Sequence, residues 1–353
     1  MKRKKLFEYR NIIKALTAAL GIYISIRYAA ECTEGIKKGI MFCLEVLIPS
    51  LFLFMVLSSY LVRSGLIQAL SKPFGSLTRS LFRLPPPSLP VILLSMIGGY
   101  PIGARSAALL YEEGQLSASE AEKTACIAVC AGPGFLINYV GNALLHHTSA
   151  GTILLISEIA GVLITGLMVG RWMHSDPPIR RTFLHHHKQN SLLIRCVSDA
   201  SYAAYRMCGM VILGAACIEV IGSLSPDAAV TDLLSAAIEI TGGCQRLCGH
   251  YPLYGIAFFI GFGGLSVHGQ IFAGMGEIPV NKALFFLFRI IQGIIAAVCT
   301  YILLMVFPIQ QSVFNSTDVP MTFGTYATPV ASAALVILSL CFTGSVHQKQ
   351  LRR

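Results

Sequence analysis

The stretch "SMIGGYPIGARSAALLYEEGQ" (Ser95–Gln115) interrupts a part of the chain that is otherwise apolar. Gly98, Gly99 and Pro101 disfavour a regular helix, and a cation, Arg105, follows shortly after them. Backbone at membrane depth must keep its hydrogen bonds within the protein, so glycine-rich irregular backbone persists only where protein or a wet cavity surrounds it. We therefore interpret the stretch as a broken membrane segment that acts as a binding element.

The composition predicts an all-α polytopic membrane protein. Of the 353 residues, 54% are hydrophobic and only 12% are charged, which is too little charge to cover a soluble globule of this size. Several apolar runs approach the roughly 20 residues that a helix needs to cross a bilayer. These runs lack period-two alternation, which argues against strands.

The formal net charge of +10 does not indicate nucleic-acid binding. The basic residues lie in short, separated clusters at 2–5, 63–83, 171–206 and 349–353. Such clusters between apolar spans are typical of the positive-inside bias, and no aromatic-interleaved basic face accompanies them. The sequence predicts a lipid bilayer as a partner and no nucleic acid.

About eight membrane-crossing helices and two shorter hairpins account for the apolar segments. The predicted spans are 12–30, 39–63, 118–146, 150–173, 207–225, 253–276, 281–307 and 328–345. The segments 87–113 and 229–248 are each split by glycines, and we interpret them as re-entrant hairpins. With the basic N-terminus in the cytoplasm, only this reading keeps Arg180, Arg181 and Lys188 on the cytoplasmic side.

The order of these segments indicates an inverted-topology repeat, as in many secondary transporters. Each half contains a span, a hairpin, a broken span and a final span, and matched elements cross in opposite directions. A second register, which pairs 97–105 with 260–268, stays open. The predicted parts are an anchor helix (1–38), a first repeat (39–173), a basic linker with an interfacial helix (174–206), a second repeat (207–307) and a C-terminal span with its loop (308–353).

Four breaks carry the predicted substrate site: "GGYPIG" (98–103), "AGPGF" (131–135), "TGG" (241–243) and "GFGGLSVHGQ" (261–270). Two breaks in each half suggest half-helix ends that converge, where exposed N–H groups attract anions and exposed carbonyls hold cations. The candidate substrate-binding residues are Gly98, Gly99, Tyr100, Pro101, Gly103, Arg105, Gly132, Pro133, Asn138, Glu239, Gly242, Gly263, Gly264, Ser266, His268 and Gln270.

Several of these side chains have more than one reading. Arg105 meets a substrate carboxylate, reaches the cytoplasmic interface or forms a structural ion pair, because a cation in a membrane helix needs a partner or water. Asn138 binds substrate or joins two helices. Glu239 coordinates a cation or pairs with Arg105 across the repeat. The other acidic candidates in or near spans are Glu45, Glu158 and Glu219.

The segment after the fourth break offers a titratable group. Ser266, His268 and Gln270 alternate along the chain and would line one side if the backbone there is extended. His268 titrates near neutral pH, so proton coupling is one reading, and a histidine that bridges helices is the other.

No metal, cofactor or catalytic centre is predicted. Most of the eleven cysteines lie in apolar segments, where they act as small apolar residues, and no CxxC pair or HExxH motif is present. "GLSVHG" (264–269) departs from a GxSxG nucleophile elbow because His268 stands where glycine is needed. Without a Walker A pattern, direct ATP drive is not expected either.

Taken together, the motifs resemble a known group. "GGYPIGARSAALLYEEGQLSASEAEK", "CAGPGFLINYVG", "EITGG" and "GFGGLSVHGQ" resemble the nucleoside-recognition, or Gate, membrane superfamily. Their order and spacing are similar to those of its sporulation integral membrane proteins. The resemblance covers 45–309 and implies transport of dipicolinate across the outer forespore membrane of a spore-forming bacterium. The segment "AVCAGPG" departs from the asparagine- and serine-rich pattern usual before Gly-Pro.

The sequence thus predicts a transporter of a small anionic solute, dipicolinate, through a site between two inverted repeats. Transport of a nucleoside, an ion or another carboxylate stays open, as does a structural role in spore envelope assembly without transport. An enzyme is not predicted. Whether the chain forms a homo-oligomer, and which ion drives it, the sequence leaves open.

Overall fold

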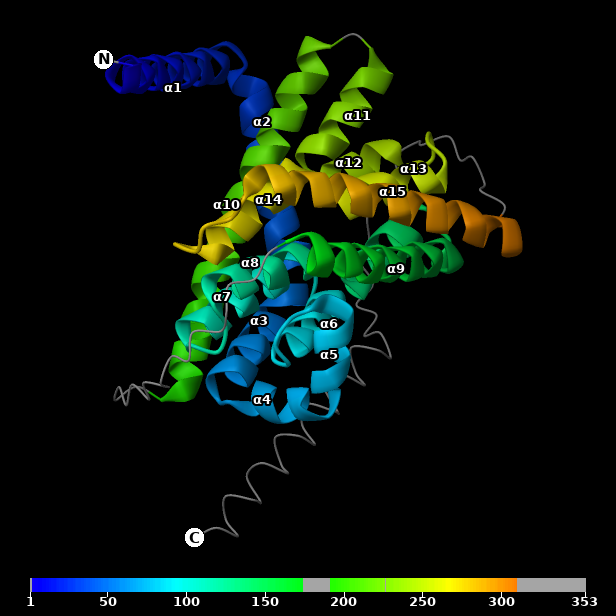
Figure 1. The fold of residues 1–353 in the computed structure, drawn as a ribbon. Helices are drawn as coiled ribbons and strands as arrows, with labels where there is room; N and C mark the ends of the chain where they lie inside the picture. The colour runs from blue at the N-terminus through cyan, green and yellow to red at the C-terminus, as the bar shows by residue number, and fades with distance from the viewer. Residues whose placement is uncertain (1, 174–190, 226, 310–353) are drawn as a thin grey trace. The chain divides into compact units, whose positions relative to one another are not determined.

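Every regular element in the part of the chain that the computed structural model describes is a helix (Figure 1). The described residues are 2–173, 191–225 and 227–309, so the predicted span 328–345 lies outside them. The helices are α1 (Lys2–Arg27), α2 (Ala29–Phe42), η1 (Cys43–Leu47), α3 (Ile48–Arg63), α4 (Leu66–Ser71), η2 (Lys72–Phe74), α5 (Gly75–Phe82), α6 (Ser88–Gly98), α7 (Tyr100–Glu112), α8 (Ala118–Ile127), η3 (Gly134–Leu144), α9 (Thr148–Trp172), α10 (Leu192–Leu224), α11 (Ala228–Ile238), α12 (Ile240–Leu247), α13 (Leu253–Phe262), α14 (Gly264–Met275) and α15 (Lys282–Val306).

Five segments of the described chain are long and apolar enough to cross a membrane. They are Ala29–Arg63, Thr148–Trp172, Leu192–Leu224, Leu253–Met275 and Lys282–Val306. Each overlaps one of the predicted spans. The predicted span 118–146 is divided into α8 and η3, as its glycine-rich break indicates, and 12–30 overlaps α1. The helix content is that of an integral membrane protein, whereas the number of eight crossings stays a prediction.

Helix α10 differs from its prediction. It begins at Leu192 rather than near residue 207, so it runs without interruption through the end of the predicted linker 174–206. Ser191 caps its first turn, with its Oγ accepting from the N–H of Ile194 at 3.3 Å. Hydropathy places a boundary near 207 because polar residues precede it, yet two of these, Asp199 and Arg206, have polar partners on other helices.

The first predicted hairpin is present as α6 and α7, which are separated by Gly99 alone. Gly99 has φ +91° and ψ −179°, a combination that only glycine adopts readily. The two helices fold back on each other, because a Cβ added to Gly103 in α7 would lie 2.8 Å from the Cβ of Ser95 in α6. Gly99 therefore reverses the chain, and no loop is needed.

The second predicted hairpin is formed by α11 and α12, with Glu239 between them. The carboxylate of Glu239 caps α12 by accepting from the N–H groups of Thr241 at 3.0 Å and Gly242 at 2.8 Å. Gly243 packs directly on Ala236, which brings α12 back along α11. The chain thus reverses at a side-chain cap in the second hairpin, whereas it reverses at a glycine in the first.

Each hairpin tip packs against the break of a divided helix. A Cβ added to Gly132, between α8 and η3, would lie 3.2 Å from both the nitrogen of Gly99 and the carbonyl oxygen of Ile97. A Cβ added to Gly264, at the start of α14, would lie 3.2 Å from the carbonyl oxygen of Ile238 and 3.3 Å from the nitrogen of Ile240. The two sites have the same construction, although they are built from different parts of the chain.

Helices α9 and α15 run side by side through the middle of the described fold (Figure 1). They approach closely because Gly161 of α9 faces Gln292 of α15, whose Cγ would lie 3.2 Å from an added Cβ. At this crossing the Nε2 of Gln292 donates to Oε1 of Glu158 at 2.9 Å. The contact between the two helices therefore contains a buried polar pair.

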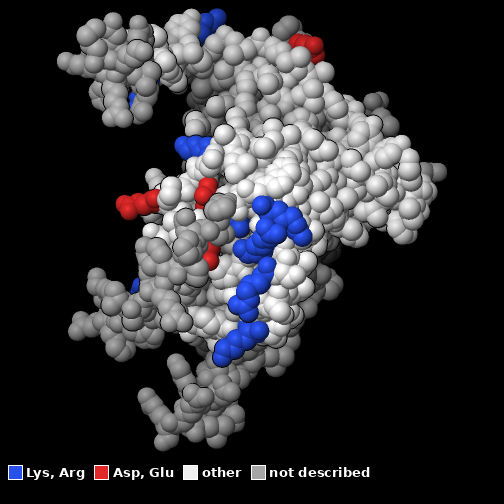
Figure 2. Space-filling view, viewed as in Figure 1, with Lys and Arg blue, Asp and Glu red and all other residues white. Residues whose placement is uncertain are grey.

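Basic side chains gather in a column on one face of the molecule (Figure 2). The column lies over the region of α5. Arg79 lies in α5 and Arg83 directly follows it. Arg171, at the end of α9, contacts the same region because it donates to the carbonyl of Leu81 at 3.5 Å. One end of the fold is thus enriched in positive charge.

Gly103 tests the packing of the first hairpin. In Gly103→Ala the new Cβ overlaps the carbonyl oxygen of Ala128 and lies 2.6 Å from the Cβ of Ala128, so we expect a loss of about 1–3 kcal/mol in stability. Thermal unfolding of the purified protein in detergent measures the change. The matched control is Gly209→Ala in α10, where nothing lies within 4 Å and alanine favours the helix. An unfolding midpoint for Gly103→Ala at or above that of the control would contradict the packing.

Candidate functional site

The break after α8 releases backbone carbonyls that have no helical donor. Four residues after Val129 stands Pro133, which has no N–H, so the carbonyl of Val129 cannot bond within a helix. Arg289 of α15 fills this role: its guanidinium donates to Cys126 O at 2.6 Å and to Val129 O at 3.3 Å. Gln292 adds a third bond, to Val129 O at 3.0 Å. Fully buried side chains from α15 thus satisfy the end of α8.

The break after α13 is satisfied in the same manner by other residues. The hydroxyl of Tyr100, in α7, donates to the carbonyl of Ile260 at 2.8 Å. Nε2 of His268 lies 2.7 Å from the carbonyl of Phe262, and since a carbonyl only accepts, Nε2 carries the proton. The His268 ring is 1% exposed and packs edge-on against Phe262, Phe285 and Phe286. His268 therefore binds a helix end in this arrangement.

Glu158, Arg289 and Gln292 form what we term the central polar cluster. All three are at most 1% exposed, and they lie in the two helices that cross at the middle of the fold. Gln292 links the other two, because its amide donates both to Glu158 and to the carbonyl that Arg289 binds. Oε2 of Glu158 and Oε1 of Gln292 have no hydrogen-bond partner among the described residues. Ionisable groups buried in membrane helices generally mark a functional site.

Two residues of this cluster escaped the sequence-based prediction. Glu158 was one of four acidic candidates, but Arg289 and Gln292 were not singled out. The available signal is "FRIIQG" (288–293), an arginine and a glutamine within an otherwise apolar span. A polar residue deep in such a span requires a partner, and this requirement would have pointed to both.

One of the two readings of Glu239 is wrong, and the condition under which Ser266, His268 and Gln270 would line one side is not met. Glu239 neither pairs with Arg105 nor leaves the start of α12 open to an anion, because its carboxylate is occupied by two N–H groups of α12. Ser266, His268 and Gln270 do not line one side of an extended segment, since all three lie in α14. In a helix, residues four apart share a face, and Gln270 Nε2 accordingly donates to Ser266 Oγ at 3.4 Å.

The remaining predicted residues are mostly packing positions. Gly98 lies against Ile102 and Gly242 against Ile218. Gly263 has φ +88°, and a Cβ added to it would lie 3.7 Å from the ring of Tyr100. Pro133 begins η3. Asn138 is half-buried in η3 and makes no side-chain hydrogen bond to another described residue. These residues shape the breaks, and none of them presents a polar side chain to a cavity.

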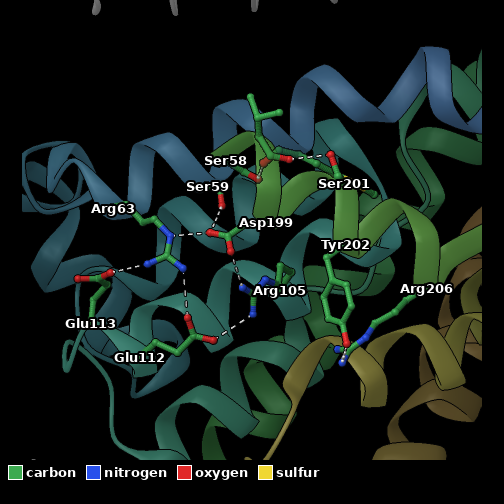
Figure 3. Close-up of polar contacts among 12 residues, drawn as sticks. Ser58, Ser59, Arg63, Arg105, Glu112, Glu113, Asp199, Ser201, Tyr202 and Arg206 are labelled. Atoms are coloured by element: carbon green, nitrogen blue, oxygen red, sulfur yellow. Dashed lines mark hydrogen bonds and ion pairs between the residues drawn. The ribbon is translucent and has the colours of Figure 1, made fainter. Parts of the chain in front are cut away.

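Arg105 forms ion pairs with protein carboxylates (Figure 3). Its guanidinium lies 3.0 Å from Glu112 and 3.5 Å from Asp199. Arg63, at the end of α3, lies 2.6 Å from Asp199, 2.9 Å from Glu113 and 3.4 Å from Glu112. We term these five residues the arginine–carboxylate network. It joins the ends of α3 and α7 to the first turns of α10, and it contains Asp199, which the sequence did not indicate.

A cavity of about 420 Å³ opens beside this network, between α7, α10 and α14. We term it the α7–α10–α14 cavity. Three of the predicted substrate-binding residues, Pro101, Arg105 and Gln270, line it. The lining also includes Ala108, Tyr111, Glu112, Tyr202, Ala203, Arg206, Met207, Gly274, Met275, Gly276, Glu277 and Ile278. Its volume suits a small-molecule ligand.

Arg289 tests the idea that its role is to satisfy the end of α8. Arg289→Leu removes the guanidinium donor from the carbonyls of Cys126 and Val129. The carbonyl of Val129 keeps Gln292 as a donor but that of Cys126 loses its side-chain donor, so we expect a loss of about 1–3 kcal/mol in stability. The measurement is the thermal unfolding midpoint in detergent. Arg171→Leu, at the exposed end of α9, is the control and should change stability by about 0.5 kcal/mol or less. Equal midpoints for the two variants would refute this role.

Comparison with known proteins identifies one relevant similarity. Over 319 residues the chain is 25% identical to the sporulation integral membrane protein YlbJ of Bacillus subtilis (strain 168). The aligned region covers 76% of this chain and 77% of YlbJ. No family model matches the chain. No solved structure matches it either. The chain is therefore an integral membrane protein, helical in every regular element of its described part, and similar to a protein of sporulation.

Proposed function

We propose that this protein carries a small anionic solute, dipicolinate, across a membrane during sporulation. The observation that carries the proposal is the pair of helix breaks whose released carbonyls are satisfied by buried polar side chains. A protein that only anchors or packs in a membrane has no need of such breaks, whereas transporters place them around the solute pathway. The similarity to a sporulation integral membrane protein supports the biological setting.

The arrangement of elements supports two inverted repeats. Helices α6 to α9 recur in order as α11 to α15, with a hairpin, a divided helix and a long helix in each half. Gly132 and Gly264 contact equivalent atoms of their hairpin tips. Glu158 and Gln292 occupy the same position along α9 and α15, counted from the first residue of each helix, and they bond to each other. Such a symmetric contact is a natural hinge between halves in alternating access.

The distribution of charge supports an orientation. The basic column of Figure 2 and the arginine–carboxylate network both involve the end of the fold where α3 finishes and α5 lies. By the positive-inside bias this end faces the cytoplasm. The α7–α10–α14 cavity adjoins the network, so we propose that it opens toward the cytoplasm. We further propose the outer forespore membrane as the location, as the resemblance to the Gate superfamily implies.

The proposal predicts a specific defect in the host. Deletion of the gene should leave spores with little dipicolinate while the mother cells retain it, because the acid would lack a route into the forespore. Dipicolinate is measured in both compartments by its terbium luminescence. Complementation with the intact gene should restore the spore content. Normal spore dipicolinate in the deletion strain would refute the proposed function.

Uptake by the purified protein in liposomes separates this proposal from its alternatives. Dipicolinate uptake that a nucleoside does not inhibit would support anion transport. Uptake of adenosine alone would instead favour a nucleoside transporter. No uptake of either solute, together with abnormal spore coats in the deletion strain, would favour a structural role in the spore envelope.

A further inference from the structure

Arg206 lines the α7–α10–α14 cavity and forms no ion pair with a carboxylate of the described residues. It lies on α10, and its guanidinium donates to the carbonyl of Ala273 at 2.6 Å and to the hydroxyl of Tyr202 at 2.9 Å. Both partners are uncharged. Among the described residues no carboxylate lies within ion-pair distance of it. A guanidinium has five N–H donors, so three are left for a ligand.

Arg105, the other arginine of the cavity, differs in this respect. Asp199 and Glu112 already hold it, and Asp199 is shared with Arg63 (Figure 3). A solute carboxylate would have to displace one of these protein carboxylates before it could bind Arg105. The electrostatic gain of an added anion is therefore smaller at Arg105 than at Arg206. The sequence analysis singled out Arg105 and did not include Arg206 among the candidates, whereas this difference favours Arg206.

The surroundings of Arg206 favour a flat carboxylate. The guanidinium carbon of Arg206 lies 4.2 Å from the centre of the Tyr202 ring, one helical turn earlier on α10 (Figure 3). This contact restrains the orientation of the guanidinium, whose planar fork matches a carboxylate. Met207 and Ile278 add apolar lining, and Tyr111 adds a second ring. Glu112 and Glu277 also line the cavity, so a solute with one or two carboxylates meets a mixed lining in which Arg206 is the free cation.

We propose that Arg206 is the primary anion-binding residue of the α7–α10–α14 cavity and that it binds the carboxylate of a small aromatic acid. The proposal rests on the proposed function for the identity of the solute, but the binding step stands separately from transport. Arg105 then acts as a positioning residue that holds α7 against α10, with its carboxylate partners kept in place.

Equilibrium binding to the purified protein tests the proposal. The probes are dipicolinate, with two carboxylates, picolinate, with one, and pyridine, with none. We expect the intact protein to bind dipicolinate and picolinate but not pyridine. Arg206→Gln should lower the affinity for both acids by at least roughly tenfold, since it removes a charge-assisted pair of hydrogen bonds. Arg206→Lys, which keeps the charge but not the fork, should weaken them less.

Matched variants guard against an indirect effect. Arg195→Gln removes an arginine from the same helix outside the cavity and should leave binding unchanged. Arg105→Gln should lower the unfolding midpoint, and it should weaken the binding of both acids less than Arg206→Gln does. If Arg206→Gln fails to fold, Arg206→Lys and Tyr202→Phe decide: picolinate affinities equal to that of the intact protein in both would overturn the proposal.

The outcomes distinguish this inference from the proposed function. Normal acid binding by folded Arg206→Gln would overturn the inference even if liposome uptake proceeds. Acid binding lost in Arg206→Gln without uptake by the intact protein would support the site while refuting transport. No binding of either acid by the intact protein would overturn the inference outright.

Discussion

Backbone carbonyls released inside a membrane need donors from the protein itself, and the centre of this fold is arranged around that requirement. Where α8 ends, Arg289 and Gln292 reach across from α15 to donate. Where α13 ends, Tyr100 donates from the first hairpin. These donors lie far away in the sequence, and at the end of α13 His268 of the neighbouring α14 donates as well. Each break is therefore completed by a helix from a distant part of the chain, and these contacts fix the two helix ends within the fold.

The sequence predicted the architecture better than the roles of side chains. The helical class and the glycine breaks follow from composition and from residues such as Gly99, whose backbone conformation suits glycine. Local sequence does not show which groups meet in space. Glu239 caps its own helix instead of facing Arg105, and Arg289 finds its acceptors far away in the sequence. Residues 266–270 lie in a helix, so the extended backbone considered for them does not occur. Alternation of polar residues does not exclude a helix.

The buried arginine of the central polar cluster and the arginines near the end of α3 have different kinds of partner. In the central polar cluster, Arg289 donates to two backbone carbonyls, and no carboxylate of the described residues lies within ion-pair distance of it. Toward the end of α3, Arg63 and Arg105 face carboxylates directly. Arg206 belongs to neither pattern, since it binds a carbonyl and a phenol beside a cavity. Among the described residues Arg206 is in no ion pair, and unlike Arg289 it lines a cavity.

The reach of Arg289 has a consequence for biogenesis. It donates to Cys126, a residue 163 positions earlier, so the end of α8 stays incomplete until the ribosome has made α15. Until α15 is inserted, the end of α8 must therefore be kept out of contact with lipid, for example by the insertion machinery or in a water-filled cleft. A fragment truncated before α15 would carry an unfinished helix end permanently and become a substrate for membrane quality control.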